Sequence, residues 1–334
     1  MKVAHVLLSP RIGGAETVVS SLDNGFKVRG VDSVVIYLDD SDQKQNRLRR
    51  FVGLRKKLKR CDAEHILAHS FLPALYARLA APRRSSVHYV LHSASDDYDS
   101  LANRIIERVL LMRTKSVIAV SSKQLGVYLR HFRKNVESTV INNGVSASFG
   151  AKGLYRLQPS PFRVVTIARV SAQKRPAFWI EVAQLAHERN MNFVFEWWGP
   201  LSGSLGTDNL VLNNLPPNAF FMGPTEKPEI QLRTADIVFQ TSDREAFSLS
   251  ILEAAIAGIP QIYSDKLELE KSLEKTLYAY QNSSPLSALE TLESIVAAWP
   301  EPAKAAIDFS STAYRSFGID QATEKYLSWL LKER

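Results

Sequence analysis

The sequence is poor in the features that mark secreted or membrane-embedded proteins. Cys61 is the single cysteine among 334 residues, so no disulfide can form within the chain, which fits a reducing compartment. The apolar run Val3–Leu8 is too short for the apolar part of a signal peptide, and no run reaches the ~18 apolar residues of a membrane span. We therefore expect a cytoplasmic protein, either free or bound peripherally at the inner face of the cytoplasmic membrane.

Acidic residues are fewer than basic ones. The chain has 42 Lys and Arg against 34 Asp and Glu, and the formal net charge of +8 favours anionic partners such as phosphates, nucleic acids or acidic lipids. No nucleic-acid recognition motif accompanies this charge, so we expect no nucleic-acid partner. Hydrophobic residues make up 45% of the chain, enough for ordinary cores, and the length indicates two domains.

Short apolar runs alternate with segments of helical spacing over residues 1–145. This alternation is typical of a doubly wound α/β domain, in which parallel strands are buried on both faces of the sheet. The runs expected to form strands are Val3–Leu8, Ser33–Leu38, His65–His69, Ser86–His92, Ser116–Val120 and Thr139–Asn142.

The alternation stops in a small, polar and proline-containing stretch, residues 146–161, and then starts again. We therefore predict an N-terminal Rossmann-like domain over residues 1–150 and a second one over residues 151–315, facing each other across a cleft where ligands of such folds bind. The remaining residues, 316–334, are predicted to be helical, and the chain after Ser264 reads as mainly helical throughout. The strands and helices expected in the second half are Arg163–Ala168, Pro176–Arg189, Asn192–Trp198, Ala219–Met222, Ala235–Gln240, Ser248–Ala257 and Pro260–Ile262.

A pair of glycines, Gly13 and Gly14, follows the first predicted strand. Glycines at such a turn allow a ligand to approach the backbone, and the amide groups that begin a helix attract phosphate. A glycine turn without any ligand is an equally good interpretation of this segment alone. The turn lacks the third glycine of the dinucleotide-binding motif, which disfavours an NAD-dependent dehydrogenase, and it lacks the Gly-Lys-Ser/Thr of a P-loop.

Two cations follow the first predicted strand of the second half. Arg169 and Lys174 suit a diphosphate, which Arg binds in a fork and Lys as a point charge; solvated loop charges are the alternative. Glu245 and Glu253 are separated by seven residues, and eight residues of helix rise ~12 Å, so they cannot flank one scissile bond as in a retaining hydrolase. Glu253 lies among apolar residues, where a hydroxyl-rich ligand is a natural explanation for a carboxylate; a position on the helix surface is the alternative.

Together these segments resemble the family 4 retaining glycosyltransferases of GT-B fold, over residues 3 to about 330. The resemblance implies transfer of a sugar from a nucleoside diphosphate sugar to a glycan or lipid-linked glycan acceptor, in bacterial surface polysaccharide synthesis. It also implies that the C-terminal helix, residues 316–334, crosses back to the first domain. The segments that match are Gly13–Glu16, Val117–Ser121, Val140–Val145, Arg169 with Lys174, Glu245 with Glu253, and Gly258–Pro260.

The resemblance also implies roles for individual residues. The first domain is expected to bind the acceptor and the second the donor. Arg169, Lys174, Glu245 and His92 are expected at the reacting centre, where the cations neutralise the leaving diphosphate and Glu245 holds hydroxyls of the donor sugar. Catalysis then rests on stabilising the charge that develops on the diphosphate. The residues expected to bind the nucleotide and its phosphates are Gly13, Gly14, Phe247, Ser248, Leu249 and Glu253.

No cofactor and no catalytic metal are implied, and a UDP-sugar is favoured over a GDP-sugar. Two other interpretations stay open: a nucleotide-sugar epimerase or hydrolase, and a non-catalytic nucleotide-sugar binding protein. At several positions the chain has another residue where the family usually has glycine, and at one position it has another residue where aspartate is common. A weakened catalyst is therefore a further alternative, and Trp197 and Trp198 are expected to reshape or partly close the pocket. The departures are Ala168, Trp197, Ala246, Ser248 and, in place of aspartate, Ser146.

Two further features bear on binding. His65 and His69, like His88 and His92, are spaced by four on predicted strands, ~13 Å apart and too far to share a metal ion, although His69 and His92 end neighbouring runs. Residues 44–60 contain nine Lys or Arg and no acid, with apolar residues interleaved. This segment indicates either an amphipathic helix on an anionic membrane or a solvated basic helix between two strands.

Overall fold

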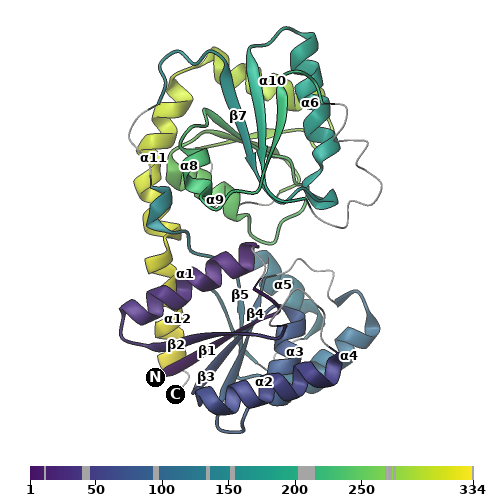
Figure 1. Ribbon diagram of the computed structural model, residues 1–334, viewed down its shortest axis with the longest axis vertical. Coiled ribbons are helices and arrows are strands. Elements are labelled where there is room, and N and C mark those ends of the chain that lie inside the picture. The colour runs from purple at the N-terminus through teal and green to yellow at the C-terminus, as the bar shows by residue number, and fades with distance from the viewer. Residues whose placement is uncertain are drawn as a thin grey trace. The chain divides into compact units, whose positions relative to one another are not determined.

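The computed structural model describes residues 1–10, 13–39, 46–92, 98–132, 136–150, 155–201, 215–267, 269, 273 and 276–332. They form two compact units, which we call unit 1 (Met1–Gly144 with Phe317–Arg334) and unit 2 (Val145–Ser316). Each unit contains a six-stranded sheet in which every pair of neighbouring strands is parallel (Figure 1). The predicted α/β fold is therefore confirmed.

The sheet of unit 1 has the strand order β2-β1-β3-β4-β5-β6. Its last strand begins two residues earlier than the sequence predicts. The strands are β1 (Lys2–Leu7), β2 (Asp32–Tyr37), β3 (His65–His69), β4 (Ser86–Leu91), β5 (Ser116–Ala119) and β6 (Glu137–Val140). The helices are α1 (Gly14–Val28), α2 (Arg47–Cys61), α3 (Phe71–Ala80), α4 (Leu101–Leu110), α5 (Ser122–His131) and α12 (Ile319–Lys332).

The two faces of this sheet differ in chemistry. One face buries alternate apolar side chains, such as Val6 and Tyr89, against α2, α3 and α5. The opposite face carries buried histidines and is covered by α1 and α12: the ring of His5 lies 5.4 Å from Phe26 of α1, and the Trp329 indole of α12 donates to Ser116. A helix from the end of the chain therefore completes the cover of the first sheet.

Helix α12 is held to the rest of unit 1 by ion pairs and by close packing. Arg29, the C-cap residue of α1, donates to Asp320 over 3.2 Å and to Glu324 over 2.6 Å. At the end of the first stretch of unit 1, a Cβ on Gly144 would lie 2.7 Å from the Cα of Ile319. Glycine is needed at this position because the backbone of α12 leaves no room for a methyl group.

We expect Gly144→Ala to lower the free energy of unfolding by about 1–3 kcal/mol, since the new methyl group displaces α12 from unit 1. Gly126→Ala is the matched control, because Gly126 lies in α5 with open space around its Cα and the change there is expected to be neutral or stabilising. Urea unfolding of both variants measures the effect. Equal stability of the two variants would contradict the packing of α12 described here.

The sheet of unit 2 has the order β12-β11-β10-β7-β8-β9, and its core is rich in aromatic rings, among them Trp179 and Trp197. The described part of the chain after Ser264 is mainly helical, as predicted, but it also contains a strand that the sequence did not predict, β12, which pairs with β11. The strands are β7 (Phe162–Ile167), β8 (Phe193–Trp198), β9 (Ala219–Gly223), β10 (Ile237–Gln240), β11 (Gln261–Ser264) and β12 (Leu277–Tyr280). The helices are α6 (Pro176–Glu188), α8 (Pro228–Leu232), α9 (Leu249–Ala257), α10 (Pro285–Ala297) and α11 (Glu301–Phe317).

In the part of the chain that the structure describes, no helix has both the length and the apolar character needed to cross a membrane.

Candidate active site

The loop after β7 and the loop after β10 meet at the carboxyl edge of the second sheet. Lys174 Nζ lies 2.5 Å from Glu245 Oε1, and both side chains are largely buried. Gln173 Nε2 donates to the carbonyl of Arg244 over 2.8 Å, and the Thr241 hydroxyl donates to the carbonyl of Lys174. Two residues predicted for the reacting centre from distant parts of the sequence are therefore in direct contact.

Arg169, the other predicted cation, follows β7 at this same edge and is exposed. The carbonyl of its neighbour Ala168 accepts a hydrogen bond from the Trp197 indole over 2.7 Å. Trp197 is fully buried, and its ring centroid lies 5.5 Å from that of Trp179. The expectation that Trp197 partly closes a pocket is therefore wrong, because its side chain fills the core; Trp198 is half-buried.

Helix α9 begins without a side-chain cap. Ser248 stands at its N-cap position, but its hydroxyl accepts from Gln240 Nε2 over 2.7 Å instead of capping the helix. The amide groups of the first turn, beginning at Leu249, therefore keep their hydrogen-bonding capacity for an anionic ligand. Phe247 precedes this turn and is half-buried. At its other end, α9 is terminated by Gly258 in the left-handed conformation, as predicted.

Glu253 lies one turn into α9 and is half-buried between apolar neighbours. Burial raises the pKa of its carboxyl to about 7, with Glu229 of α8 adding to the rise and Lys174 opposing it. The side chain therefore does not point outward into bulk water. A carboxyl group held in this way is costly to the fold, which is typical of residues kept for ligand binding.

In unit 1 the predicted glycines lie where α1 begins. Gly13 is the N-cap residue, in an extended conformation with φ of −159°, and Gly14 is the first residue of the helix. No side chain caps α1, and Thr17 bonds to the carbonyl of Gly13 through both its amide and its hydroxyl. The preceding residues, Arg11 and Ile12, lie outside the described residues. The start of α1 thus offers backbone amides at the carboxyl edge of β1.

His92 follows β4 and is half-buried. Its Nε2 lies 2.8 Å from Nδ1 of His69, whose Nε2 lies 3.0 Å from Nδ1 of His5. The sequence indicated the proximity of His69 and His92 but not the part of His5. Among the described residues, no group of three or more His, Cys, Asp or Glu side chains is arranged to hold a metal ion.

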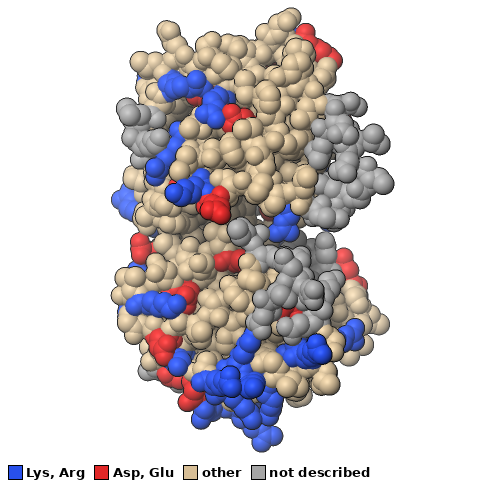
Figure 2. Space-filling model, in the orientation of Figure 1, with Lys and Arg blue, Asp and Glu red and all other residues tan. Residues whose placement is uncertain are grey.

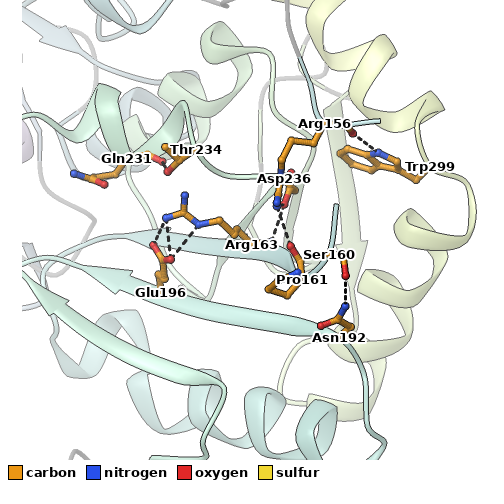
Figure 3. A network of polar contacts seen from close by, with 10 residues as sticks. All are labelled: Arg156, Ser160, Pro161, Arg163, Asn192, Glu196, Gln231, Thr234, Asp236 and Trp299. Atoms are coloured by element: carbon orange, nitrogen blue, oxygen red, sulfur yellow. Dashed lines mark hydrogen bonds and ion pairs between the residues drawn. The ribbon is translucent and has the colours of Figure 1, made fainter. Parts of the chain in front are cut away.

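A cavity of about 410 Å³ lies at the opposite, amino edge of the second sheet; it is lined by the turn Gly258–Pro260 but by none of the predicted catalytic or nucleotide-binding residues. Asp236, just before β10, accepts from Arg156 Nε over 2.9 Å and from the backbone amide of Arg163 over 2.7 Å (Figure 3). Arg163 Nη2 donates to both carboxylate oxygens of Glu196 over 2.8 Å, and its Nε donates to one of them over 3.1 Å. The Arg156 pair ties the segment before β7 to the sheet and the Arg163 pair joins β7 to β8, so we interpret both as structural.

Two sequence families and many solved structures match this chain. Residues 12–149 match the family described as Glycosyltransferase Family 4, and residues 161–292 match the family described as Glycosyl transferases group 1. The crystal structure of Anabaena Alr3699/HepE, in complex with UDP and glucose, matches with a TM-score of 0.83 over 99% of this chain and 100% of that one. The chain carries both domains of a GT-B glycosyltransferase.

At 16% sequence identity the Anabaena structure establishes the fold of this glycosyltransferase and nothing finer. The same holds for sucrose-phosphate synthase from Thermosynechococcus elongatus, with a TM-score of 0.78, 16% identity and coverage of 99% and 98%. It holds too for the lipopolysaccharide outer core galactosyltransferase WaaB, with a TM-score of 0.70, 16% identity and full coverage of both chains. No curated protein sequence matches the chain.

Proposed function

We propose that the protein is a retaining glycosyltransferase that transfers a hexose from a nucleoside diphosphate sugar to a glycan or lipid-linked glycan, in the synthesis of a bacterial surface polysaccharide. The observation that carries this proposal is the contact between Lys174 and Glu245 beside the uncapped start of α9. A fixed cation and helix amides stabilise the charge that develops on a leaving diphosphate. Glu253 lies farther along the same helix, where a second part of an elongated ligand is bound.

We assign to these residues the roles that the resemblance implies. Lys174 and Arg169 neutralise the diphosphate, together with the backbone amides around Phe247, Ser248 and Leu249. Glu245 accepts from hydroxyls of the donor sugar, and Glu253 from the ribose hydroxyls of the nucleotide. Unit 1 binds the acceptor and unit 2 the donor. Within unit 1, the amides at Gly13 and Gly14 are assigned to phosphate and His92 to the reacting sugar.

The donor is a UDP-sugar in preference to a GDP-sugar, and no metal is required. Support comes from the Anabaena protein, whose solved complexes contain UDP and UDP-glucose. The basic residues around the proposed diphosphate site, Arg169 and Lys174, supply the positive charge that a metal ion otherwise supplies.

Thermal unfolding of the full chain with UDP, GDP, ADP and their sugar conjugates tests donor binding. We expect UDP and UDP-sugars at millimolar concentration to raise the melting temperature most, since a ligand at 100 times its Kd adds about 2.7 kcal/mol to the free energy of unfolding. Failure of every nucleotide to stabilise the protein would overturn the proposal. An epimerase or hydrolase consumes the nucleotide sugar without an acceptor, and a binding protein shows no turnover at all.

We also propose that unit 1 binds an anionic membrane surface, where a lipid-linked acceptor lies. Leu54 and Leu58 of α2 do not serve this purpose because they are buried in the core, whereas Leu48 and Val52 of the same helix are exposed. Most cations of residues 44–60 remain available (Figure 2 shows Lys and Arg gathered over α2). The exceptions are Arg50, which pairs with Asp39, Lys57, whose Nζ donates to the carbonyl of Tyr37 over 3.0 Å, and Lys44, which is outside the described residues. Six are exposed: Arg47, Arg49, Arg55, Lys56, Lys59 and Arg60.

Helix α4 and the turn after it add an apolar stripe in the same unit. Leu101, Ile105, Val109 and Met112 recur at helical spacing, and each is more than half exposed. Cations attract unit 1 to anionic headgroups, and an apolar stripe of this kind enters the boundary between headgroups and acyl chains.

We expect the double variant Ile105→Ser, Val109→Ser to sediment less with vesicles of phosphatidylglycerol and phosphatidylcholine, by about tenfold in partition coefficient. The reason is the loss of two exposed apolar side chains. Leu157→Ser combined with Leu286→Ser removes two exposed leucines of unit 2 and serves as the control, expected to bind as the wild type does. Binding unaffected by charge, salt or the first pair of substitutions would refute the membrane proposal.

A further inference from the structure

Five of the seven histidines lie on one face of the sheet of unit 1, where they form two hydrogen-bonded chains. The register explains this arrangement: His5 and His88 both pair with Leu67 of β3, and His65 and His69 are each two residues from Leu67, so all these side chains point to one side. The first chain joins His5, His69 and His92, and the second joins His65, His88 and Ser116.

The rings of the first chain are neutral at pH 7. Burial lowers the pKa of His5 and of His92 to about 4, and lowers the pKa of His69 well below its usual value. A neutral imidazole has one N–H donor and one lone pair. Each ring can therefore donate at one nitrogen and accept at the other, and the two hydrogen bonds that join the three rings give the chain a direction.

The buried end of the chain decides that direction. His5 Nε2 is buried and has no hydrogen-bond partner among the described residues. If the chain runs inward from His92, this nitrogen is an unpaired buried N–H, which proteins rarely tolerate. If the chain runs outward, it is a bare lone pair, and the N–H groups of His5 and His69 both point toward His92.

We propose that His5 and His69 are positioning residues that hold His92 as its Nδ1–H tautomer, so that His92 presents a hydrogen-bond donor at the carboxyl edge of the sheet. Its Nε2 is occupied as the acceptor of the His69 N–H, which leaves Nδ1–H as the group that faces a ligand. This inference rests on the proposed function, in which the ligand is the donor sugar and the group bound is a sugar oxygen. His92 thus acts as a donor and not as a general base.

Nuclear magnetic resonance of the full chain, labelled with ¹⁵N-histidine and free of substrate, tests the tautomers directly. We expect His5, His69 and His92 to carry their protons on Nδ1 at pH 7, with assignments made from single His→Gln variants. An Nε2–H tautomer for His92 overturns the proposal. Because no nucleotide sugar is present, this result is independent of the proposed function, whose failure would appear only as absent turnover and absent nucleotide binding.

The variant His5→Phe preserves the volume of the ring and removes the first donor. We expect a smaller fraction of the Nδ1–H tautomer at His92 and a roughly tenfold loss of kcat, the worth of one hydrogen bond of about 1.4 kcal/mol, with little change in the KM for the donor. His65→Phe is the matched control, because His65 is equally buried on the same sheet face but begins the second chain. The control is expected to leave the His92 tautomer and kcat unchanged. Equal losses of kcat in the two variants, with the His92 tautomer unmoved, would reduce His5 to a packing residue and refute the proposal.

Discussion

Lys174→Ala is expected to lower the turnover of sugar transfer by about 10²- to 10³-fold, the usual effect of removing one group that stabilises developing negative charge. The side chain is placed for this role by its 2.5 Å contact with Glu245 and by the hydrogen bond from Thr241 to its own carbonyl. Removal of the Lys174 side chain also leaves the largely buried Glu245 without its cation, which further lowers the affinity for the donor. Initial rates with a UDP-sugar and the Kd for UDP measure the two effects.

Lys304→Ala is the control for that experiment. Lys304 forms a 3.0 Å ion pair with Glu301 in the same unit, but the pair is exposed at the start of α11. Exposed pairs contribute little, so we expect wild-type rates and wild-type stability. Turnover by Lys174→Ala close to that of Lys304→Ala would show that the diphosphate lies elsewhere.

Glu253→Gln is expected to stabilise the protein at pH 8 while it abolishes tight binding of the nucleotide. The folded pKa of Glu253, about 7, lies above the ordinary value of 4.5. Between these values the folded chain holds a proton that the unfolded chain has lost, so the free energy of unfolding falls as pH rises through this window. Above pH 7 the full cost is present, on the order of 3 kcal/mol, and the glutamine removes it.

The pH dependence separates this effect from a general change in stability. At pH 4 the carboxyl is mostly protonated in both states, and the variant and the wild type are expected to differ little in stability. Glu181→Gln makes the same chemical change at an exposed position of α6 and is expected to alter stability by less than about 0.5 kcal/mol at either pH. Unchanged stability of Glu253→Gln at pH 8, measured by urea unfolding, would contradict the buried, ligand-binding role of this carboxyl.

The sequence predicted the fold because the signals involved are local. Buried parallel strands are near-continuous apolar runs, and the proline of Pro176 and the glycine of Gly258 mark the start of α6 and the end of α9 as expected. The strand β12 was not predicted because Leu277–Tyr280 is too short to show a period, and its pairing partner β11 lies in another segment. The pairing of strands that are distant in sequence cannot be predicted from the local sequence of either strand.

The difference between local and non-local signals also applies to the candidate active site. Motif spacing indicated Lys174 and Glu245, but their direct contact depends on two loops meeting after separate strands. Trp197 could not be placed from sequence, because whether an aromatic ring at a strand end faces the core or a ligand depends on the side from which its neighbours pack. Trp179 and Phe221 settle that question. His5 was missed for a similar reason, since its partner lies 64 residues away in sequence.

The location of α12 has a consequence for synthesis. Unit 1 begins with the first strand of the chain, yet the helix that covers its histidine-bearing face consists of residues near the end. During translation this face of the sheet therefore stays uncovered by α12 until the whole of unit 2 has been synthesised. A fragment that ends at Gly144 keeps all six strands of the first sheet but exposes Ser116 and its neighbours. Rejoining Ile319–Lys332 ahead of Met1 through a flexible linker is the permutation expected to let unit 1 fold alone.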